Sequence, residues 1–311
     1  MMAAMESSGK TTDNFDSGER GSVPLASLAV LRARGADALT FLQGQLSNDC
    51  MQLSIERSLL AGYHNPQGRV IALLRLIFLA RDDVLAILPR ELAAPVAQRL
   101  GRFILRAKVK LTDNSAAWCI HGLAGTAQTF PELPQVHNAV QLAGATLVLR
   151  VTPEPARWLW LAPAAGDAQP PAAATLVERA WRSLGIRAGE PQITAGTSEE
   201  FVAQMLNLDC LGAIAFDKGC YTGQEVIARA HYRGRVKRRM QRFRTLGRHT
   251  LAAGDSGTLS DGRPFKVVEA SALADGRCEF LAVAPLSADS AVVPAGALAA
   301  EALSLPYPLP D

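Results

Sequence analysis

Residues 217–229 have the sequence Asp217-Lys-Gly-Cys-Tyr-Thr-Gly-Gln-Glu-Val-Ile-Ala-Arg229. Within this stretch, Thr222-Gly-Gln-Glu225 fits the capping box, in which a Thr side chain accepts a hydrogen bond from the first helical turn and a Glu reaches back. A helix is therefore predicted to begin near Gly223, with Glu225 and Arg229 spaced four apart for an ion pair. The preceding residues, 218–221, are expected to form a loop just ahead of the helix N-terminus.

Cys220 is the candidate nucleophile of this loop. A helix N-terminus carries partial positive charge and free N–H groups, which favour a thiolate over a thiol. Lys218 adds a full positive charge two residues away. Cys220 and Lys218 are therefore candidate catalytic residues. The sequence leaves open the alternative of an inert thiol beside a surface lysine.

A run of positive charge follows the loop. Nine Arg and Lys residues lie between Arg229 and Arg248 with no acid among them, although the whole chain has a net charge of only +3. A basic cluster on an otherwise acidic protein predicts an anionic partner at one place on the surface. The alternative is a solvated basic face.

Composition limits the class of protein. The chain has 311 residues, 49% hydrophobic and 20% charged, which favours one large or two to three small folded domains. Its longest apolar stretches flank Arg75 and are much shorter than the roughly 18 residues of a membrane span. Five scattered cysteines without a C-x-x-C pair argue against a disulfide framework and a metal site, so we expect no bound metal and a reducing cytoplasm.

Apolar spacing predicts two units of similar order, followed by a small all-β module beyond Arg248. The first unit has a strand over 25–32, a helix over Asp37–Leu46, a hairpin of Val70–Ala80 with Val84–Leu88, a helix over Glu91–Phe103 and a strand over Val109–Leu111. The second has a hairpin of Thr146–Val151 with Arg157–Ala162, then a helix after a second capping box, Thr175-Leu-Val-Glu178. Two such units suggest an α+β protein with antiparallel sheets.

The octapeptide Lys218-Gly-Cys-Tyr-Thr-Gly-Gln-Glu225 resembles the signature of the YgfZ family of folate-binding proteins, which are related to the aminomethyltransferase (T-protein) of the glycine cleavage system. The resemblance extends over roughly residues 25–285. It includes Phe41-Leu-Gln-Gly-Gln-Leu-Ser-Asn-Asp49, Pro66-Gln-Gly-Arg69, Arg187-Ala-Gly-Glu190, Asn207-Leu-Asp209, Leu211-Gly212 and Tyr232-Arg-Gly-Arg-Val-Lys-Arg238.

The resemblance implies a three-domain ring around a central folate cavity, built from two ferredoxin-like α+β domains and a C-terminal small β-barrel. On this basis we expect a disordered tail over 1–22. A folate-binding domain would combine 23–50 with 115–235, a second domain would span 51–114, and the barrel with its arm would span 236–311. The implied role is tetrahydrofolate-dependent support of iron–sulfur cluster assembly or repair, with an indirect effect on tRNA modification.

The expected cofactor contacts follow from the same resemblance. Gly219 permits close approach of a ligand to the backbone, and Tyr221 offers a stacking face. Asn48 and Asp49 end a helix that is expected to face the cavity, although Asn and Asp at such positions often only form turns. The expected folate-contacting residues are Gly219, Tyr221, Gly223, Gln224, Glu225, Asn48, Asp49, Arg229 and Arg235, with the basic residues contacting the glutamate tail or an anionic client protein.

The chain departs from the transferase relative at two positions. The acid that follows the Gly-rich turn of that enzyme is replaced here by Ala72-Leu73, which cannot transfer a proton. Arg187 stands near a pterin-binding Glu, and a guanidinium only donates hydrogen bonds. We therefore expect an accessory protein, acting with iron–sulfur client or assembly proteins. The alternatives are an aminomethyltransferase-like enzyme and an RNA-binding module that contacts tRNA through Arg229–Arg248.

Overall fold

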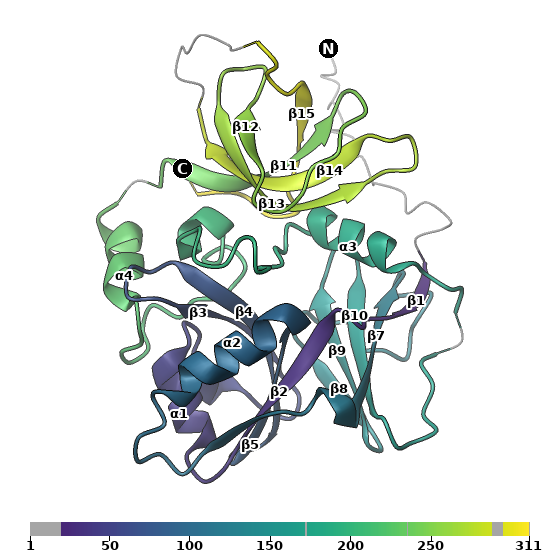
Figure 1. The fold of residues 1–311 in the computed structure, drawn as a ribbon. Coiled ribbons are helices and arrows are strands. Elements are labelled where there is room, and N and C mark those ends of the chain that lie inside the picture. The colour runs from purple at the N-terminus through teal and green to yellow at the C-terminus, as the bar shows by residue number, and fades with distance from the viewer. Residues whose placement is uncertain (1–19, 172, 235, 288–294, 311) are drawn as a thin grey trace, which may run out of the picture.

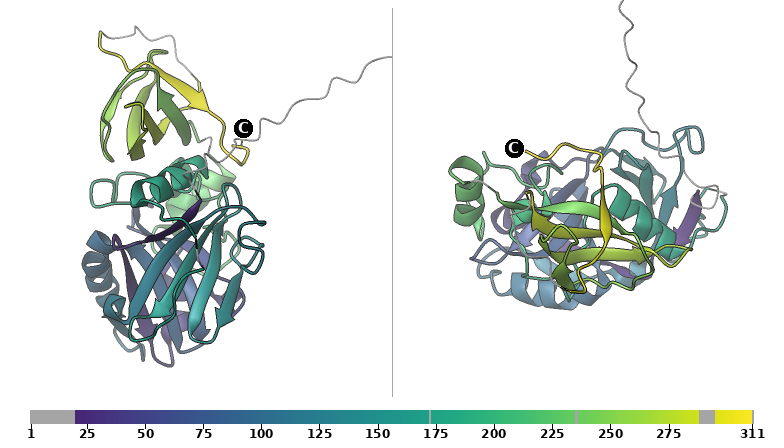
Figure 2. Two further views of the ribbon diagram at one scale, coloured as in Figure 1. Left: turned by 90° about the vertical axis from the view of Figure 1, so that its right-hand side faces the viewer. Right: turned by 90° about the horizontal axis from the view of Figure 1, so that it is seen from above.

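Three five-stranded antiparallel sheets organise the chain (Figure 1). The computed structural model describes residues 20–171, 173–234, 236–287 and 295–310. Two of the sheets lie side by side, and the C-terminal sheet lies beyond helix α3 on one end of that pair, as two further views show (Figure 2). The expected mixture of helices with antiparallel sheets is confirmed.

The first sheet has the strand order β3-β4-β5-β2-β6. Its strands are β2 (Leu28–Arg34), β3 (Leu59–His64), β4 (Val70–Ala80), β5 (Asp83–Pro89) and β6 (Lys110–Asp113), with helices α1 (Ala38–Gln45) and α2 (Arg90–Gly101) and a short 3-10 turn, η2 (Cys50–Gln52). The expected hairpin and both expected helices are thus confirmed within a few residues. Leu74 and Leu76 face the α1 and α2 side, whereas Ile77 faces the second sheet. Burial on both faces explains why β4 is almost continuously apolar.

The second sheet has the order β1-β7-β10-β9-β8. Its elements are β1 (Gly21–Pro24), β7 (Trp118–Ala124), β8 (Val140–Ala143), β9 (Thr146–Thr152), β10 (Arg157–Pro163), the 3-10 turn η3 (Ser115–Ala117) and α3 (Glu178–Arg187). The predicted capping box at Thr175 is wrong. Val177 is the N-cap, Thr175 forms a bridge with Ser22, and the Glu178 carboxylate accepts a hydrogen bond from the Ser27 hydroxyl. Partners distant in sequence therefore replace the local cap.

The third sheet has the order β12-β13-β14-β11-β15. Its strands are β11 (Arg238–Thr245), β12 (Ser256–Thr258), β13 (Pro264–Ala272), β14 (Cys278–Pro285) and β15 (Ala300–Leu303). Phe243, Phe265 and Phe280 form the centre of its own core. The predicted all-β composition of this region is confirmed.

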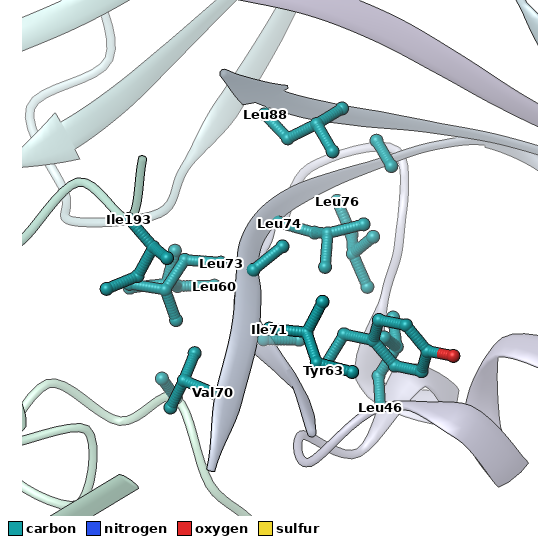
Figure 3. Packing of buried hydrophobic residues seen from close by; sticks show 14 of the residues in the cluster. Leu46, Leu60, Tyr63, Val70, Ile71, Leu73, Leu74, Leu76, Leu88 and Ile193 are labelled. Atoms are coloured by element: carbon teal, nitrogen blue, oxygen red, sulfur yellow. The ribbon is translucent and has the colours of Figure 1, made fainter. Parts of the chain in front are cut away.

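The long segment between α3 and β11 packs against the first sheet. It contains a 3-10 turn, η4 (Ala203–Leu206), and helix α4 (Gln224–Tyr232). Ile193 of this segment lies beside Leu60 and Leu73 of the first sheet (Figure 3). Phe201, also from this segment, is buried in the same core.

The strand pairing divides the chain differently from the expected domain boundaries. β2 pairs with β5 and β6, so the chain from β2 through α1 belongs with 51–114 and not with 115–235. The 217–229 loop likewise lies in the part of the chain that packs on the first sheet, because Tyr221 and Ile227 join its core. Of the expected disordered tail, residues 1–19 lie outside the described residues, whereas Gly21 and Ser22 form part of β1. The physical reason is that hydrogen bonding between strands distant in sequence decides which segments share a sheet, whatever their order along the chain.

Candidate functional site

A cavity of about 360 Å³, called the main cavity below, lies where the first sheet, the second sheet, the segment between α3 and β11, and the C-terminal residues Pro306 and Tyr307 meet. Its walls are partly apolar, with Leu59, Leu60 and Leu211, and partly polar. The polar lining residues come from segments far apart along the chain: Asn48, Arg57, His137, Asn138, Thr152, Glu154, Glu190 and Tyr307.

Glu190, which lines this cavity, is the centre of a charge network with two buried arginines behind the cavity wall. Its carboxylate accepts a hydrogen bond from Arg75 at 2.9 Å and lies 3.5 Å from the Arg157 guanidinium. Arg75 also donates to the side-chain oxygen of Asn138. Both arginines are almost fully buried. Because burial lowers the pKa of His137, with the Arg75 charge adding to the effect, the wall of this cavity holds a neutral imidazole at neutral pH.

A smaller cavity of about 110 Å³ adjoins the first and shares Leu60 and Glu190 with it. Glu269 of the third sheet lines this second space and accepts a hydrogen bond from the Gln192 backbone N–H at 3.1 Å. Burial raises the pKa of Glu269 to about 7, against the opposing effect of that hydrogen bond. The charged groups of all three sheets thus meet at Glu190 and its neighbours.

The Cys220 loop lies elsewhere, at the end of α1. Lys218 donates to the carbonyl oxygens of Gln43 at 2.6 Å, Leu46 at 2.6 Å and Asn48 at 2.9 Å. An ammonium there satisfies backbone acceptors that a helix C-terminus leaves open and complements its partial negative charge. Burial lowers the pKa of Lys218. Lys218 is thus held by α1, while the Cys220 side chain is exposed to solvent.

The predicted capping box at Thr222 is wrong. Helix α4 begins at Gln224 behind Gly223, whose φ of +83° lies in the left-handed region that favours glycine. The Gln224 side chain accepts a hydrogen bond from the Tyr221 backbone N–H at 3.3 Å. Gln224 and Tyr221 thus form the side-chain-to-backbone bond that was expected of Glu225 and Thr222. A Cβ on Gly223 would lie 2.5 Å from the Asn65 carbonyl oxygen, and this close packing decides the turn.

The other residues expected near the cofactor are distributed over several surroundings. Asn48 lines the main cavity and donates to the carbonyls of Leu60 and Gly212, each at 2.8 Å. Asp49 instead caps a turn, accepting from the Met51 N–H and from Gln43. The cavity lining, among the described residues, does not include the other candidates: Lys218, Gly219, Cys220, Tyr221, Gly223, Gln224, Glu225 and Arg229. Arg235 lies outside the described residues.

Three residues of the basic run form ion pairs with acidic side chains. Arg239 forms a two-pronged pair with Asp209, with distances of 3.0 and 2.9 Å, and Arg244 pairs with Glu301 at 2.6 Å. Arg242 pairs with the buried Glu279. Acids distant in sequence thus neutralise these three residues of the basic run. Within the described ranges, the expected Glu225–Arg229 ion pair is also absent, and both side chains are exposed.

Glu190, Arg75, Asn138 and Tyr307 are site residues that the sequence did not predict. Glu190 belongs to the Arg187-Ala-Gly-Glu190 motif, but nothing local distinguishes it from its neighbours. Arg187 lines a different cavity and pairs with Glu279. The carboxylate that this motif contributes to the main cavity is that of Glu190, three residues further along the chain. Ala72 is fully buried in β4 and supplies no acid.

Neither a metal site nor a membrane span is found in the described parts of the chain. No three His, Cys, Asp or Glu side chains are grouped there so that they could hold a metal ion. The helices described are too short or too polar to cross a membrane.

Known proteins similar to this chain include two bacterial proteins named tRNA-modifying protein YgfZ. The chain is 32% identical over 279 residues to the protein of Edwardsiella ictaluri (strain 93-146), with 84% of this chain and 83% of the relative covered. It is 32% identical over 264 residues to that of Escherichia coli O157:H7 (strain EC4115 / EHEC), with 80% of each covered. The aminomethyltransferase T of the glycine cleavage system from Bartonella henselae has a TM-score of 0.65 at 14% identity, covering 86% of this chain and 78% of that one, which shows a shared fold. No protein-family model matches.

Proposed function

The chain belongs to the YgfZ family, and on this premise we propose that it binds tetrahydrofolate and supports iron–sulfur cluster assembly or repair. Its effect on tRNA modification would be indirect, through iron–sulfur enzymes that modify tRNA. The proposal includes the ring of three domains around the cofactor. Support for this ring comes from the fold that the chain shares with aminomethyltransferase T.

The observation that carries the proposal is the 360 Å³ cavity between the sheets. Its volume lies within the range of about 300–1,000 Å³ that is typical of small-molecule sites. A pterin presents an amino group and ring N–H groups, which need acceptors. The Glu190 carboxylate has unused lone pairs beyond its two arginine contacts, and its side chain is 18% exposed. The residues present therefore fit a folate.

The remaining parts of a folate also find matching groups. Leu59, Leu60 and Leu211 offer apolar surface for the aromatic portion. Arg57, an exposed cation on the wall, is suited to the carboxylates of the glutamate tail. Arg57 is proposed for this contact because Arg229, one of the residues expected to bind the tail, does not line the cavity. Bound folate would supply the one-carbon chemistry, and this chain's part is to bind and orient it.

The residue at position 72 favours an accessory role over aminomethyl transfer. Ala72, at the position of the acid in the transferase relative, is apolar and fully buried, so it cannot move a proton. The alternative enzyme activity therefore lacks its acid at this position.

Cys220 is proposed as the residue that acts on iron–sulfur clients. Its thiol is exposed, so a partner protein can reach it. The loop is also connected to the cavity wall, because Lys218 donates to the Asn48 carbonyl and the Asn48 side chain lines the cavity. Occupation of the cavity can thereby influence the loop through one residue.

Tetrahydrofolate titration of a cavity-filling variant tests the binding proposal. Leu211→Trp places a bulky indole ring in the cavity, and Leu105→Trp makes the same change at a highly exposed site. We expect the wild type and Leu105→Trp to bind and to melt at a higher temperature with ligand, and Leu211→Trp to lose both effects. Equal binding by both variants would refute this cavity as the site.

Complementation tests the role of Cys220. A deletion strain would receive the wild type, Cys220→Ala or Cys119→Ala, since both thiols are exposed. We expect only Cys220→Ala to fail in restoring iron–sulfur enzyme activities. Full rescue by Cys220→Ala would remove the thiol from the proposal and leave folate binding intact.

A further inference from the structure

Five described cations of the basic run remain after the ion pairs are assigned: Arg248, which follows β11, and four others within residues 229–238. Arg229, Arg233, Lys237 and Arg238 are all exposed. Within the described ranges, none of the four forms an ion pair, in contrast to Arg239, Arg242 and Arg244 of the adjoining strand. Four of the five unpaired cations therefore lie in the ten residues from the end of α4 to the start of β11. Such charge is available to an anionic partner.

Aromatic rings lie at the same place. Phe216 stacks on His231 with ring centroids 3.7 Å apart and planes within 14°. Tyr232, which is 67% exposed, lies edge-on to both rings and leaves much of its own ring open to solvent. Aromatic faces beside cations are the combination that binds the bases and phosphates of unpaired nucleic acid.

A hollow of about 360 Å³ adjoins the Phe216–His231 ring pair. Phe216 and His231 line one part of it, and Gly234 and Val236 bring the backbone of the cationic segment to its rim. Its polar wall contains Gln204, Asp209 and Cys210, which offer hydrogen-bonding groups of both kinds. Its volume suits a single unstacked base.

We propose that this surface, made of the four unpaired cations, the Phe216–His231–Tyr232 rings and the hollow beside them, binds single-stranded RNA, such as a loop of tRNA. The phosphates contact the cations, and an unstacked base lies against the rings. This inference goes beyond the proposed function, in which the effect on tRNA modification is indirect, because it names RNA as a direct partner. Among the described lining residues, the hollow shares only Cys210 with the folate cavity. Failure of one site can thus be told from failure of the other.

Fluorescence anisotropy of the full chain with a labelled, unmodified tRNA transcript tests the proposal. Four phosphate contacts predict a slope of about −3 in log K against log salt concentration. Arg233→Gln and Lys237→Gln should each reduce the magnitude of the slope by about 0.7–0.9. The matched control is Arg244→Gln, because Arg244 pairs with Glu301 and should leave the slope unchanged.

Variants of Tyr232 test whether the aromatic rings of this surface contact a base. Tyr232→Ala should weaken tRNA binding about tenfold with the slope retained, because stacking on a base is lost. Tyr232→Phe keeps the ring and should bind like the wild type. Wild-type tetrahydrofolate binding by each variant would show that the folate site is intact.

Three results would overturn the proposal. One is a slope that Arg233→Gln and Lys237→Gln leave unchanged. Another is an equal loss in Arg244→Gln. The last is displacement of tRNA by an oligoglutamate peptide at the same charge concentration, because that would identify the surface as a site for acidic protein.

Discussion

Replacing Lys218 by Met removes three hydrogen bonds and a charge from the end of α1 while keeping most of the aliphatic stem. The Nζ atom lies 2.6 Å from the carbonyl oxygens of Gln43 and Leu46 and 2.9 Å from that of Asn48. Leu46 is fully buried and Asn48 nearly so, so water replaces the lost donor poorly. We therefore expect a large loss of stability.

The magnitude follows from the cost of such bonds. Each hydrogen bond to a charged group contributes about 1.5–3 kcal/mol. The three share one ammonium and are not additive, and removing it also relieves the cost of burying that charge. We therefore expect Lys218→Met to lower the free energy of unfolding by about 3 kcal/mol.

Urea unfolding followed by circular dichroism measures this difference. Lys237→Met is the matched control, because Lys237 is exposed and forms no ion pair within the described residues. A change of less than about 0.5 kcal/mol is expected there. If Lys218→Met unfolded at the same urea concentration as the wild type but lost iron–sulfur support, the structural role of Lys218 would be refuted and a catalytic one favoured.

Three further predictions concern other parts of the molecule. Gly223→Ala should destabilise the protein measurably in urea, because its φ is +83° and a Cβ would lie 2.5 Å from the Asn65 carbonyl oxygen. Burial raises the pKa of Glu269 from 4.5 to about 7, so between these pH values the folded state holds a proton that the unfolded state has released. The stability of the wild type should therefore fall as pH rises from about 4.5 to 7. Thermal melts of Glu269→Gln at several pH values should lack this dependence of stability on pH. At neutral pH, mass spectrometry should find iodoacetamide on the exposed Cys220 well before the buried Cys50, whose pKa burial raises to about 12; equal rates would contradict the difference in burial between the two thiols.

Local patterns were sufficient for most of the secondary structure. The spacing of apolar residues predicted α1, α2 and the β4–β5 hairpin within a few residues, because burial of one face or of both imposes a period on the sequence. The signature around Cys220 identified the family, which the similarity to YgfZ proteins confirmed. The signature identified the family by its residues alone and did not indicate where the loop lies in the fold.

Helix starts were less predictable. Both capping boxes, at Thr175 and Thr222, were wrong. A cap contributes only about 1 kcal/mol, so tertiary partners readily displace it. Glu178 accepts from the hydroxyl of Ser27, and the turn before α4 is decided by the close approach of Gly223 to Asn65.

Only the tertiary structure assigned the charged residues to their roles. Arg75 interrupts the apolar run of β4, and the sequence does not show that it is buried and pairs with Glu190, 115 residues away. Lys218 neighbours Cys220 along the chain but binds the end of α1, and Arg239 belongs to the basic run but is neutralised by Asp209. A sequence shows which residues carry charge, whereas the partner of a charge is decided by distance in space. The fold creates those distances by pairing strands that are far apart along the chain.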